Sequence, residues 1–218
     1  EVLLGGQTQF YKSVNGGTGW SQIATSTHVD YHDVIYSSGT TCYLTSDGGV
    51  WKSTDNGGSW NDLSDGLAIS QMYGFGQSTT NANILLQGWQ DNGTNLYDGS
   101  WNLVMGGDGM KCFIDWSDDQ NMWGSSQYGG LAMSTDGGAN FASAIGNITE
   151  TGAWVTPWLQ DPVAAGTIYA GFSNVWKSTS GGGTWTQISN FSGAATLSAL
   201  AVYPASTQVI WAASGSSL

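Results

Sequence analysis

Two aspartates in glycine-rich segments are the residues of this sequence best suited to acid–base chemistry. Asp91 lies in a Gln-Asp-Asn-Gly segment at 90–93, and Asp108 lies in a Gly-Gly-Asp-Gly segment at 106–109. A pair of carboxyl groups can act as acid and base in the hydrolysis of a glycoside. The same residues can instead be structural, because Asp91 can cap its own turn and Asp108 can hold a tight corner through hydrogen bonds to the backbone. The sequence leaves both interpretations open.

Aromatic and polar side chains in the predicted loops are candidates for binding a ligand. Tryptophan and tyrosine rings can stack on the apolar faces of sugar rings. The candidate ligand-binding residues are Gln90, Asn92, Tyr128, Glu150, Trp154 and Trp158. For Trp154 and Trp158, packing inside the protein is an equally good interpretation.

A short pattern of histidine and aspartate could hold a metal ion. His28, Asp30 and His32 alternate along the chain, so they would share one side of an extended segment. Imidazole and carboxylate groups are suitable metal ligands, but solvent-exposed or turn-bonding residues would show the same pattern. Ca²⁺ bound by carboxylates and carbonyls of a glycine-rich turn is an alternative. Apart from these metal candidates, we expect no cofactor.

An eight-residue motif recurs through the chain and must organise the elements that carry these residues. It is Ser-Thr-Asp-Asn-Gly-Gly-Ser-Trp at 53–60, returns at 134–141 and 178–185, and has a worn copy at 13–20 and a shortened one at 97–101. A short polar side chain followed by glycines predicts a tight turn. The aromatic residues that close the copies stand at 20, 60, 101, 141 and 185. A period of about 40 residues in a chain rich in Gly and Trp predicts propeller blades. The residues expected to build the full turns are Ser53, Asp55, Gly57, Trp60, Ser134, Asp136, Gly138, Phe141, Ser178, Gly181, Gly183 and Trp185.

The motif resembles the Asp-box, or BNR repeat, of sialidases, xyloglucan-degrading propellers, sortilin-type receptor domains and a photosystem assembly factor. The resemblance implies that each copy forms the hairpin between the third and fourth strands of a blade, away from the ligand face. The segments around Asp91 and Asp108 resemble a motif of exported Asp-box proteins related to xyloglucanases and sortilin-like domains. That second resemblance implies a role for Asp91 and Asp108 on a polysaccharide or glycan.

The runs between the motifs predict an all-β protein, a β-propeller of four-stranded antiparallel blades with Asp-box hairpins. In one blade, for example, strands are expected at 34–36, 41–44, 50–53 and 60–63. The chain begins with second, third and fourth strands and ends with first and second strands. We therefore expect a single segment over residues 1–218, with about four complete blades and two partial ones, cut from a larger propeller.

The order of strands in a blade places the loops on two faces. The motif turns share one face with the turns between first and second strands. The turns between second and third strands, and the loops between blades, share the other face, where propellers usually bind ligands. Asp91 and Asp108 should lie on this second face, close to each other.

Composition excludes several classes of function. The formal net charge is −12, and the chain has four lysines and no arginine. A phosphate-binding groove needs clustered basic residues, so a nucleic acid partner is excluded, and anionic membrane surfaces are disfavoured. An Asp-box sialidase holds the carboxylate of its substrate with arginines, so sialidase activity is disfavoured. No apolar run approaches the roughly 20 residues that a membrane span needs.

The remaining compositional features are typical of an exported protein. Charged residues make up only 9% of the chain, and three Asn-x-Ser/Thr sequons begin at Asn92, Asn147 and Asn190. We expect an extracellular or cell-surface location. Cys42 and Cys112 lie two repeats apart, too far for a disulfide, and should be small buried apolar residues.

Two hypotheses of function remain. The first is a secreted carbohydrate-active propeller, a glycoside hydrolase of the xyloglucanase-like type that uses Asp91 and Asp108. The second is a non-catalytic propeller that binds a glycan or a protein partner, or serves as a building block of an extracellular assembly. The sequence does not decide whether the protein is an enzyme.

Overall fold

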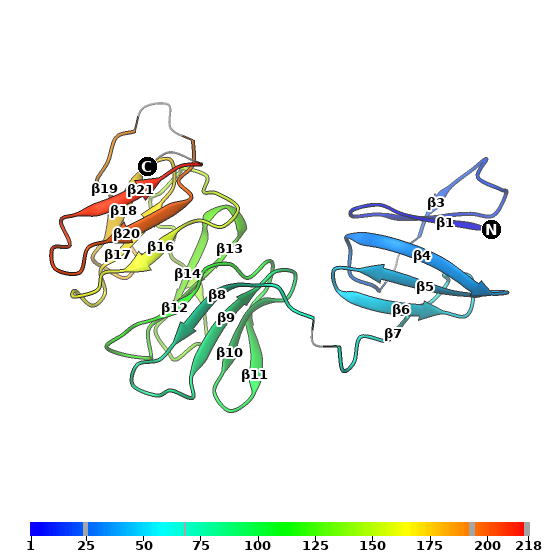
Figure 1. Cartoon of the computed structure of the whole chain (residues 1–218), viewed down its shortest axis with the longest axis horizontal. Helices are drawn as coiled ribbons and strands as arrows, with labels where there is room; N and C mark the ends of the chain where they lie inside the picture. Colours follow the sequence, from blue (N-terminus) through cyan, green and yellow to red (C-terminus); the bar gives the residue numbers. More distant parts are fainter. Residues whose placement is uncertain (24–25, 68, 192–194, 216–218) are drawn as a thin grey trace. The chain divides into compact units, whose positions relative to one another are not determined.

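The computed structural model describes residues 1–23, 26–67, 69–191 and 195–215 (Figure 1). Within these residues, the regular structure is β-strand except for one 3₁₀ turn, η1 (Gln127–Gly129). The chain forms two compact units, Glu1–Ile69 and Ser70–Leu218, each with its own sheets. The expectation of a single propeller segment over residues 1–218 stays a prediction. No helix in the described ranges is long and apolar enough to cross a membrane.

The unit Glu1–Ile69 contains two antiparallel sheets. The first has three strands, β1 (Val2–Gly5), β2 (Phe10–Ser13) and β3 (Ser21–Gln22). The second has four strands, β4 (Tyr31–Ser38), β5 (Thr41–Ser46), β6 (Gly49–Ser53) and β7 (Asn61–Asp62). The buried core of this unit consists of Leu3, Phe10, Cys42, Leu44 and Trp51.

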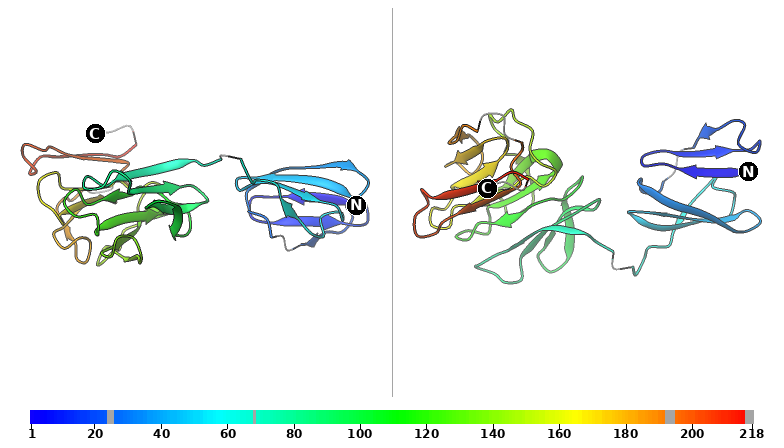
Figure 2. Two further views of the ribbon diagram at one scale, coloured as in Figure 1. Left: turned by 90° about the horizontal axis from the view of Figure 1, so that it is seen from below. Right: turned by 45° about the horizontal axis from the view of Figure 1, so that its top comes forward.

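The unit Ser70–Leu218 contains three four-stranded antiparallel sheets and one two-stranded sheet, which follow one another in chain order (Figure 2). We call each four-stranded sheet a blade. The first blade of this unit has β8 (Met72–Gln77), β9 (Leu85–Trp89), β10 (Gly93–Tyr97) and β11 (Trp101–Met105). The next has β12 (Phe113–Ile114), β13 (Met122–Ser126), β14 (Gly130–Ser134) and β15 (Ala142–Ser143). The third has β16 (Trp158–Gln160), β17 (Ile168–Gly171), β18 (Val175–Ser178) and β19 (Thr186–Gln187). The two-stranded sheet is β20 (Ala199–Val202) with β21 (Ile210–Ala213).

Alternation of side chains explains how consecutive blades bury one another. In β5, Cys42, Leu44 and Ser46 are buried, whereas the residues between them are only partly buried. Successive residues of a strand point to opposite faces of the sheet, so β5 has one core-facing side. In β10, β13 and β17 consecutive residues are buried, so these strands are covered on both faces. The prediction of an all-β protein with four-stranded antiparallel blades is confirmed.

The repeated motif folds into the same hydrogen-bonded turn at each full copy. In the β6–β7 turn, Ser53 Oγ donates to Asp55 Oδ1 at 2.7 Å and accepts from the backbone amide of Gly57 at 2.8 Å. In the β14–β15 turn, Ser134 Oγ makes the same contacts with Asp136, at 2.7 Å, and Gly138, at 2.9 Å. Each aspartate also accepts from the amide four residues ahead of it, at 2.8 Å for Asp55 and 2.9 Å for Asp136. The prediction that these copies are hairpin turns between third and fourth strands is confirmed.

Two copies without aspartate, the worn one at 13–20 and the full one at 178–185, keep this turn with other side chains at that position. Asn15 Oδ1 accepts from Ser13 Oγ at 3.0 Å and from the Gly19 amide at 2.8 Å. At 178–185, the Ser180 hydroxyl lies 3.3 Å from Ser178 Oγ and accepts from the Thr184 amide at 3.1 Å. The turn therefore needs an oxygen acceptor at this position and not a charge.

The motif turns of the unit Ser70–Leu218 at 134–141 and 178–185 pack against the blade before them. A Cβ on Gly138, whose φ is +88°, would lie 2.7 Å from Leu96 Cδ2, so only glycine allows this close approach. In the next turn, Trp185 Nε1 donates to the Ala144 carbonyl at 2.8 Å. These contacts join neighbouring blades within Ser70–Leu218.

The structure corrects the expected start of some strands. Trp60 and Trp185 were expected to begin outer strands, but they stand one residue before β7 and β19. The physical reason is visible at Trp185, whose backbone amide donates to Asn147 Oδ1 at 2.8 Å and not to the neighbouring strand.

Both cysteines are free and buried, as predicted. Burial raises the pKa of the Cys112 thiol to about 12, and its sulfur donates to the Leu86 carbonyl at 3.2 Å. Cys42 is fully buried in the other unit, where burial also raises its pKa.

Candidate functional site

Asp91 stands at the tip of the turn between β9 and β10. Its φ is +60°, a left-handed conformation that Asp and Asn adopt more readily than most residues. The turn is closed by the Asn92 amide, which donates to the Trp89 carbonyl at 3.2 Å. The half-buried carboxyl group of Asp91 is thus presented at the end of a two-stranded hairpin.

The loop that carries Asp108 packs against this turn. Asp108 Oδ1 accepts a hydrogen bond from the Asp91 backbone amide at 2.9 Å, and the Gly109 amide donates to the Trp89 carbonyl at 2.9 Å. A Cβ on Gly109 would lie 2.0 Å from the Gly93 carbonyl oxygen, so the Gly-Gly-Asp-Gly segment is needed for this approach. The structure therefore brings Asp91 and Asp108 together, and it gives Asp108 a structural hydrogen bond as well.

Only one oxygen of Asp108 is used in this way. Among the described residues, Asp108 Oδ2 accepts no hydrogen bond, and the side chain is half-buried. A carboxylate held by one oxygen has a fixed orientation and keeps the other oxygen for a ligand. This arrangement is compatible with both the structural and the chemical interpretation of Asp108.

An exposed pair of aromatic rings lies on the same face. Tyr128, in the turn between β13 and β14, and Trp154, in the loop before β16, have ring centroids 5.3 Å apart at an interplanar angle of 76°. Their exposed fractions are 55% and 37%. The Tyr128 amide donates to the Trp154 carbonyl at 3.4 Å, and the Gly152 amide donates to the Tyr128 carbonyl at 3.1 Å. The two rings are thus held by backbone hydrogen bonds on both sides of Tyr128.

Tyr128 adopts a strained backbone conformation. Its φ is +59° and its ψ is +26°, in the left-handed region that bulky residues avoid. Such a residue costs on the order of 1 kcal/mol or more and is typical of ligand-binding sites. The strain points the ring outward beside Trp154 rather than into the blade.

The loop that carries Asp108 and the turn that carries Tyr128 are neighbours. A Cβ on Gly107 would lie 3.6 Å from Gln127 Oε1, so the Asp108 loop runs beside the Tyr128 turn. Asp91, Asp108, Tyr128 and Trp154 therefore form one row on the face opposite the motif turns, within Ser70–Leu218. We call this row the candidate site.

Two further predicted residues border the candidate site. Gln90 Oε1 accepts a hydrogen bond from the Tyr73 hydroxyl at 2.8 Å, and its backbone amide donates to the Gln71 carbonyl at 2.9 Å. Asn92 is exposed, and its Nδ2 donates to the Gln90 carbonyl at 3.0 Å. Tyr73 was not among the predicted site residues. Its position in the alternating first strand of the blade, beside Gln90, was the available signal for it.

The structure corrects the ligand-binding predictions for Trp158 and Glu150. Trp158 is 1% exposed and belongs to the core, where its Nε1 donates to the Lys111 carbonyl at 3.2 Å. Glu150 accepts four hydrogen bonds, from the amides of Ser173 and Asn174, from Asn174 Nδ2 and from Trp176 Nε1, at 2.9–3.2 Å. Burial raises the pKa of Glu150, but these hydrogen bonds outweigh it, and the net pKa is lowered. Glu150 therefore holds the β17–β18 turn.

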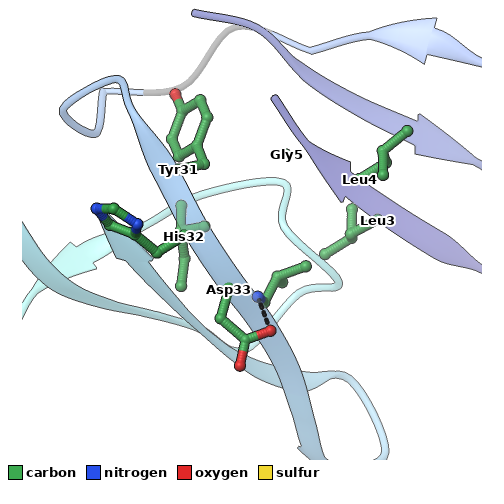
Figure 3. Close-up of a pocket in the computed structure, with 8 residues that line it drawn as sticks. Leu3, Leu4, Gly5, Tyr31, His32 and Asp33 are labelled. Atoms are coloured by element: carbon green, nitrogen blue, oxygen red, sulfur yellow. Dashed lines mark hydrogen bonds between the residues drawn. The ribbon is translucent and has the colours of Figure 1, made fainter. Parts of the chain in front are cut away.

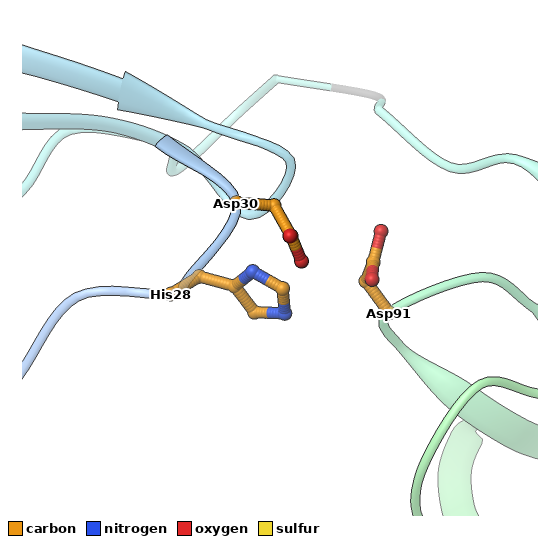
Figure 4. A group of neighbouring side chains, drawn as sticks. All are labelled: His28, Asp30 and Asp91. Atoms are coloured by element: carbon orange, nitrogen blue, oxygen red, sulfur yellow. The ribbon is translucent and has the colours of Figure 1, made fainter. Parts of the chain in front are cut away.

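The metal candidates lie in the other unit, and the structure separates them. His28 and Asp30 occupy the loop before β4, with one ring nitrogen and one carboxylate oxygen within 4.8 Å of each other (Figure 4). His32 does not join them, because its Nε2 contacts the Asp47 carboxylate. His32 and Asp33 instead line a pocket of about 180 Å³ between β1 and β4, whose other side is formed by Leu3 and Leu4 (Figure 3). The prediction that His32 shares a site with His28 and Asp30 is therefore wrong.

Comparison with family models gave no match, and comparison with curated proteins gave none. Among solved structures, the chain is similar to an ancestral GH74 enzyme, with 20% identity and a TM-score of 0.56 over 84% of this chain and 27% of that one. It is also similar to a GH74 xyloglucanase from Xanthomonas campestris, with 19% identity and a TM-score of 0.51 over 79% of this chain and 33% of that one. The chain thus spans about a third or less of these two structures. At this identity the likeness shows the fold, and the predicted propeller-type arrangement of blades is confirmed.

Proposed function

We propose that the candidate site binds a polysaccharide or glycan, and that the protein is a carbohydrate-active propeller of the xyloglucanase-like type. The proposal rests on one observation above all, the exposed pair of Tyr128 and Trp154. Because the two rings meet at a steep angle, they offer an exposed aromatic face on which a sugar ring can stack while its hydroxyl groups reach polar neighbours. Asp91, Asp108 and Asn92 supply such neighbours along the same row.

Hydrolysis would be carried out by the two carboxyl groups. Asp108 is oriented by the Asp91 amide, and its second oxygen is available for an acid–base role. Asp91 lies on the tip of the preceding hairpin, so a glycosidic bond between the two groups would meet both. In known glycosidases the separation of the two carboxyl groups, roughly 5–5.5 Å or 6.5–9.5 Å, decides between retention and inversion.

The proposal extends to the setting of the protein. The hydrogen-bonded turns at 53–60, 134–141 and 178–185 support their assignment as Asp-boxes. The sparse charge and the GH74 enzymes among the similar structures support an extracellular location. His28 and Asp30 are the remaining metal candidates, and Ca²⁺ is the ion that oxygen-rich turns of this kind would favour.

Binding and hydrolysis are tested separately. Titration of the chain with xyloglucan oligosaccharides and cello-oligosaccharides measures binding, with Tyr128→Ala and Trp154→Ala as the test variants. The matched control is Tyr203→Ala, because Tyr203 directly follows β20 and is 46% exposed. We expect at least a tenfold weaker binding for the test variants and none of this loss for the control. Equal binding by all three variants would refute the proposed site.

A non-catalytic binding role is the second candidate function. The observation in its favour is that Asp108 and Glu150 already serve as acceptors for backbone amides. Product analysis after incubation with the same oligosaccharides decides between the two. Release of reducing ends that is lost in Asp91→Asn and Asp108→Asn supports hydrolysis. Binding without any product supports a glycan- or protein-binding propeller.

A further inference from the structure

A second cavity lies on the opposite face from the candidate site. It is a groove of about 500 Å³ between the blade β12–β15 and the blade β16–β19, on the side of the motif turns. Its walls are the β12–β13 and β16–β17 turns and the two motif turns that follow them. Asp115, Asn121, Thr135, Ala165 and Thr179 contribute to the lining.

A buried carboxylate with an unused oxygen faces this groove. Asp115 is only 3% exposed, and its Oδ1 accepts from the Ser117 amide and from Ser117 Oγ, both at 2.8 Å. Among the described residues, Asp115 Oδ2 accepts no hydrogen bond. Asp115 Oδ2 is not among the enclosed polar atoms that lack a partner, so this oxygen opens to the groove, where water or a ligand can donate to it.

Between the blades β8–β11 and β12–β15, a side chain fills the place that is equivalent to the groove. There, Asp119 of the β12–β13 turn accepts from Ser78 Oγ at 3.3 Å and from Thr80 Oγ1 at 2.9 Å, and so bridges back to the blade β8–β11. The Ser78 amide closes its turn by donating to the Ile84 carbonyl, and the Asp115 amide closes the corresponding turn of the next blade by donating to the Asn121 carbonyl. Ser78 and Asp115 therefore hold equivalent positions in their turns.

The equivalent bridge is missing between the blades β12–β15 and β16–β19. The Gly137 amide donates to the Gln120 carbonyl, and the Gly181 amide donates to the Gly166 carbonyl, both at 3.0 Å. Gly166 therefore stands where Gln120 stands, and Ala165 stands where Asp119 stands. A methyl group cannot reach Asp115, so the groove stays open in front of Asp115 Oδ2.

The free polar groups in the groove select the class of ligand. Thr135 Oγ1 and Thr179 Oγ1 make no hydrogen bond within the described residues and can both donate and accept. Asp115 Oδ2 and Asn121 Oδ1 can only accept. A cation could use only the acceptor lone pairs of the threonine hydroxyls and not their O–H donors, and an anion would meet the carboxylates. Vicinal hydroxyl groups can donate to the carboxylate and amide oxygens and also accept from the threonine hydroxyls.

We propose that this groove is a binding site for a neutral, hydroxyl-rich ligand of one or two sugar rings, with Asp115 as its central acceptor. Its volume lies within the range of about 300–1,000 Å³ that is usual for small-molecule sites. The site is separate from the candidate site, which lies at the other ends of the strands. It does not depend on the function proposed there.

The experiment is a calorimetric titration of the full chain with D-glucose, D-xylose and cellobiose. Ala165→Asn is the main variant, because it restores the missing bridge to Asp115 from an exposed position. Asp115→Asn and Thr179→Val are the second and third, and thermal melts check that each is folded. Ala164→Asn, one residue outside the lining, is the matched control. All these variants are made and titrated in the Tyr128→Ala background, which removes sugar binding at the candidate site.

We expect saturable binding of at least one sugar, weakened at least tenfold by Ala165→Asn and Asp115→Asn. Ala164→Asn, made in the same Tyr128→Ala background, should bind that sugar as the background protein does. Parallel titrations with calcium chloride and ethylammonium chloride test for cation binding. Absence of sugar binding, binding of a cation only, or sugar binding that survives Ala165→Asn would overturn the proposal. Sugar binding by the unaltered chain that leaves no saturable step in the Tyr128→Ala background would assign the sugar to the candidate site alone and overturn the proposal equally.

Discussion

The backbone amide of Asp91 donates a hydrogen bond to Asp108 Oδ1 at 2.9 Å, across 17 residues of chain. This bond fixes the tip of one hairpin to the loop that enters the next blade. It means that one of the two proposed catalytic carboxylates also holds the other in place. Structural and chemical contributions of Asp108 must therefore be separated by experiment.

Replacement of Asp108 separates them. Asp108→Ala should lower the free energy of unfolding by about 1–3 kcal/mol, because it leaves the half-buried Asp91 amide without its acceptor. Asp108→Asn keeps an acceptor oxygen and should lose less, yet it should abolish any hydrolysis. Chemical denaturation measures the first effect and reducing-end release the second. Asp65→Ala, an exposed aspartate in the other unit, is the control. Equal stability of Asp108→Ala and the unaltered chain would show that the bond contributes nothing.

The motif aspartates should make the fold sensitive to acid. Hydrogen bonds from the Ser59 amide, Ser53 Oγ and Ser59 Oγ lower the pKa of Asp55 to about 2. Those from Asn140 Nδ2, Ser134 Oγ and the Asn140 amide lower that of Asp136 to about 2 as well. A carboxyl group whose pKa is lower in the folded state stabilises the fold above its ordinary pKa, near 3.8, and this stabilisation is lost as pH falls towards 2.

Asparagine at these positions removes the acid sensitivity. Asn15 shows that an amide oxygen maintains the turn, so Asp55→Asn and Asp136→Asn should fold normally at neutral pH. The double variant should lose less stability between pH 4 and pH 2 than the unaltered chain does, as measured by melting temperature across this range. Parallel curves for the two proteins would contradict the role given to these carboxylates.

The closing tryptophans should differ in their contribution to stability according to their burial. Trp185 is 4% exposed, and Trp185→Ala should cost about 3–5 kcal/mol as a large-to-small change in the core. Trp185→Phe keeps most of the packing but loses the hydrogen bond to the Ala144 carbonyl. The loss of this bond should lower the free energy of unfolding by about 1 kcal/mol, in addition to the effect of the smaller buried side-chain area. Trp20 holds the same place in its motif but is 42% exposed, so Trp20→Ala should cost clearly less. Denaturant unfolding followed by circular dichroism compares the three, and a larger loss for Trp20→Ala would be contrary to the structure.

Substitution of Gly138 tests the packing between blades. Gly138→Ala must place a methyl group 2.7 Å from Leu96 Cδ2 at a φ of +88°, so overpacking and backbone strain add, each costing on the order of 1 kcal/mol or more. Gly99 has a φ of +122° and no neighbouring atom within 4 Å, so Gly99→Ala isolates the strain alone. We expect the thermal midpoint of Gly138→Ala to fall further than that of Gly99→Ala. Equal shifts would mean that Leu96 moves aside without cost.

The blades and their turns could be predicted from the sequence because the interactions that form them are local. Ser53, Asp55, Gly57 and Ser59 complete their hydrogen bonds within seven residues, so the residues that specify the turn are also the residues that build it. The period of the motif then places the strands between turns. The approach of Asp91 to Asp108 followed from the same strand order.

Tertiary packing alone decided which polar and aromatic residues are available to a ligand. Trp154 and Trp158 are the same residue type in the same segment, but one lies on the surface beside Tyr128 and the other is enclosed beside Phe113. Glu150 is occupied by donors 23 to 26 residues away, and the groove at Asp115 exists because Ala165 on the next blade is too short to reach it. Burial and long-range hydrogen bonds depend on which surfaces meet once the blades stack, and the local pattern of the sequence does not contain that information.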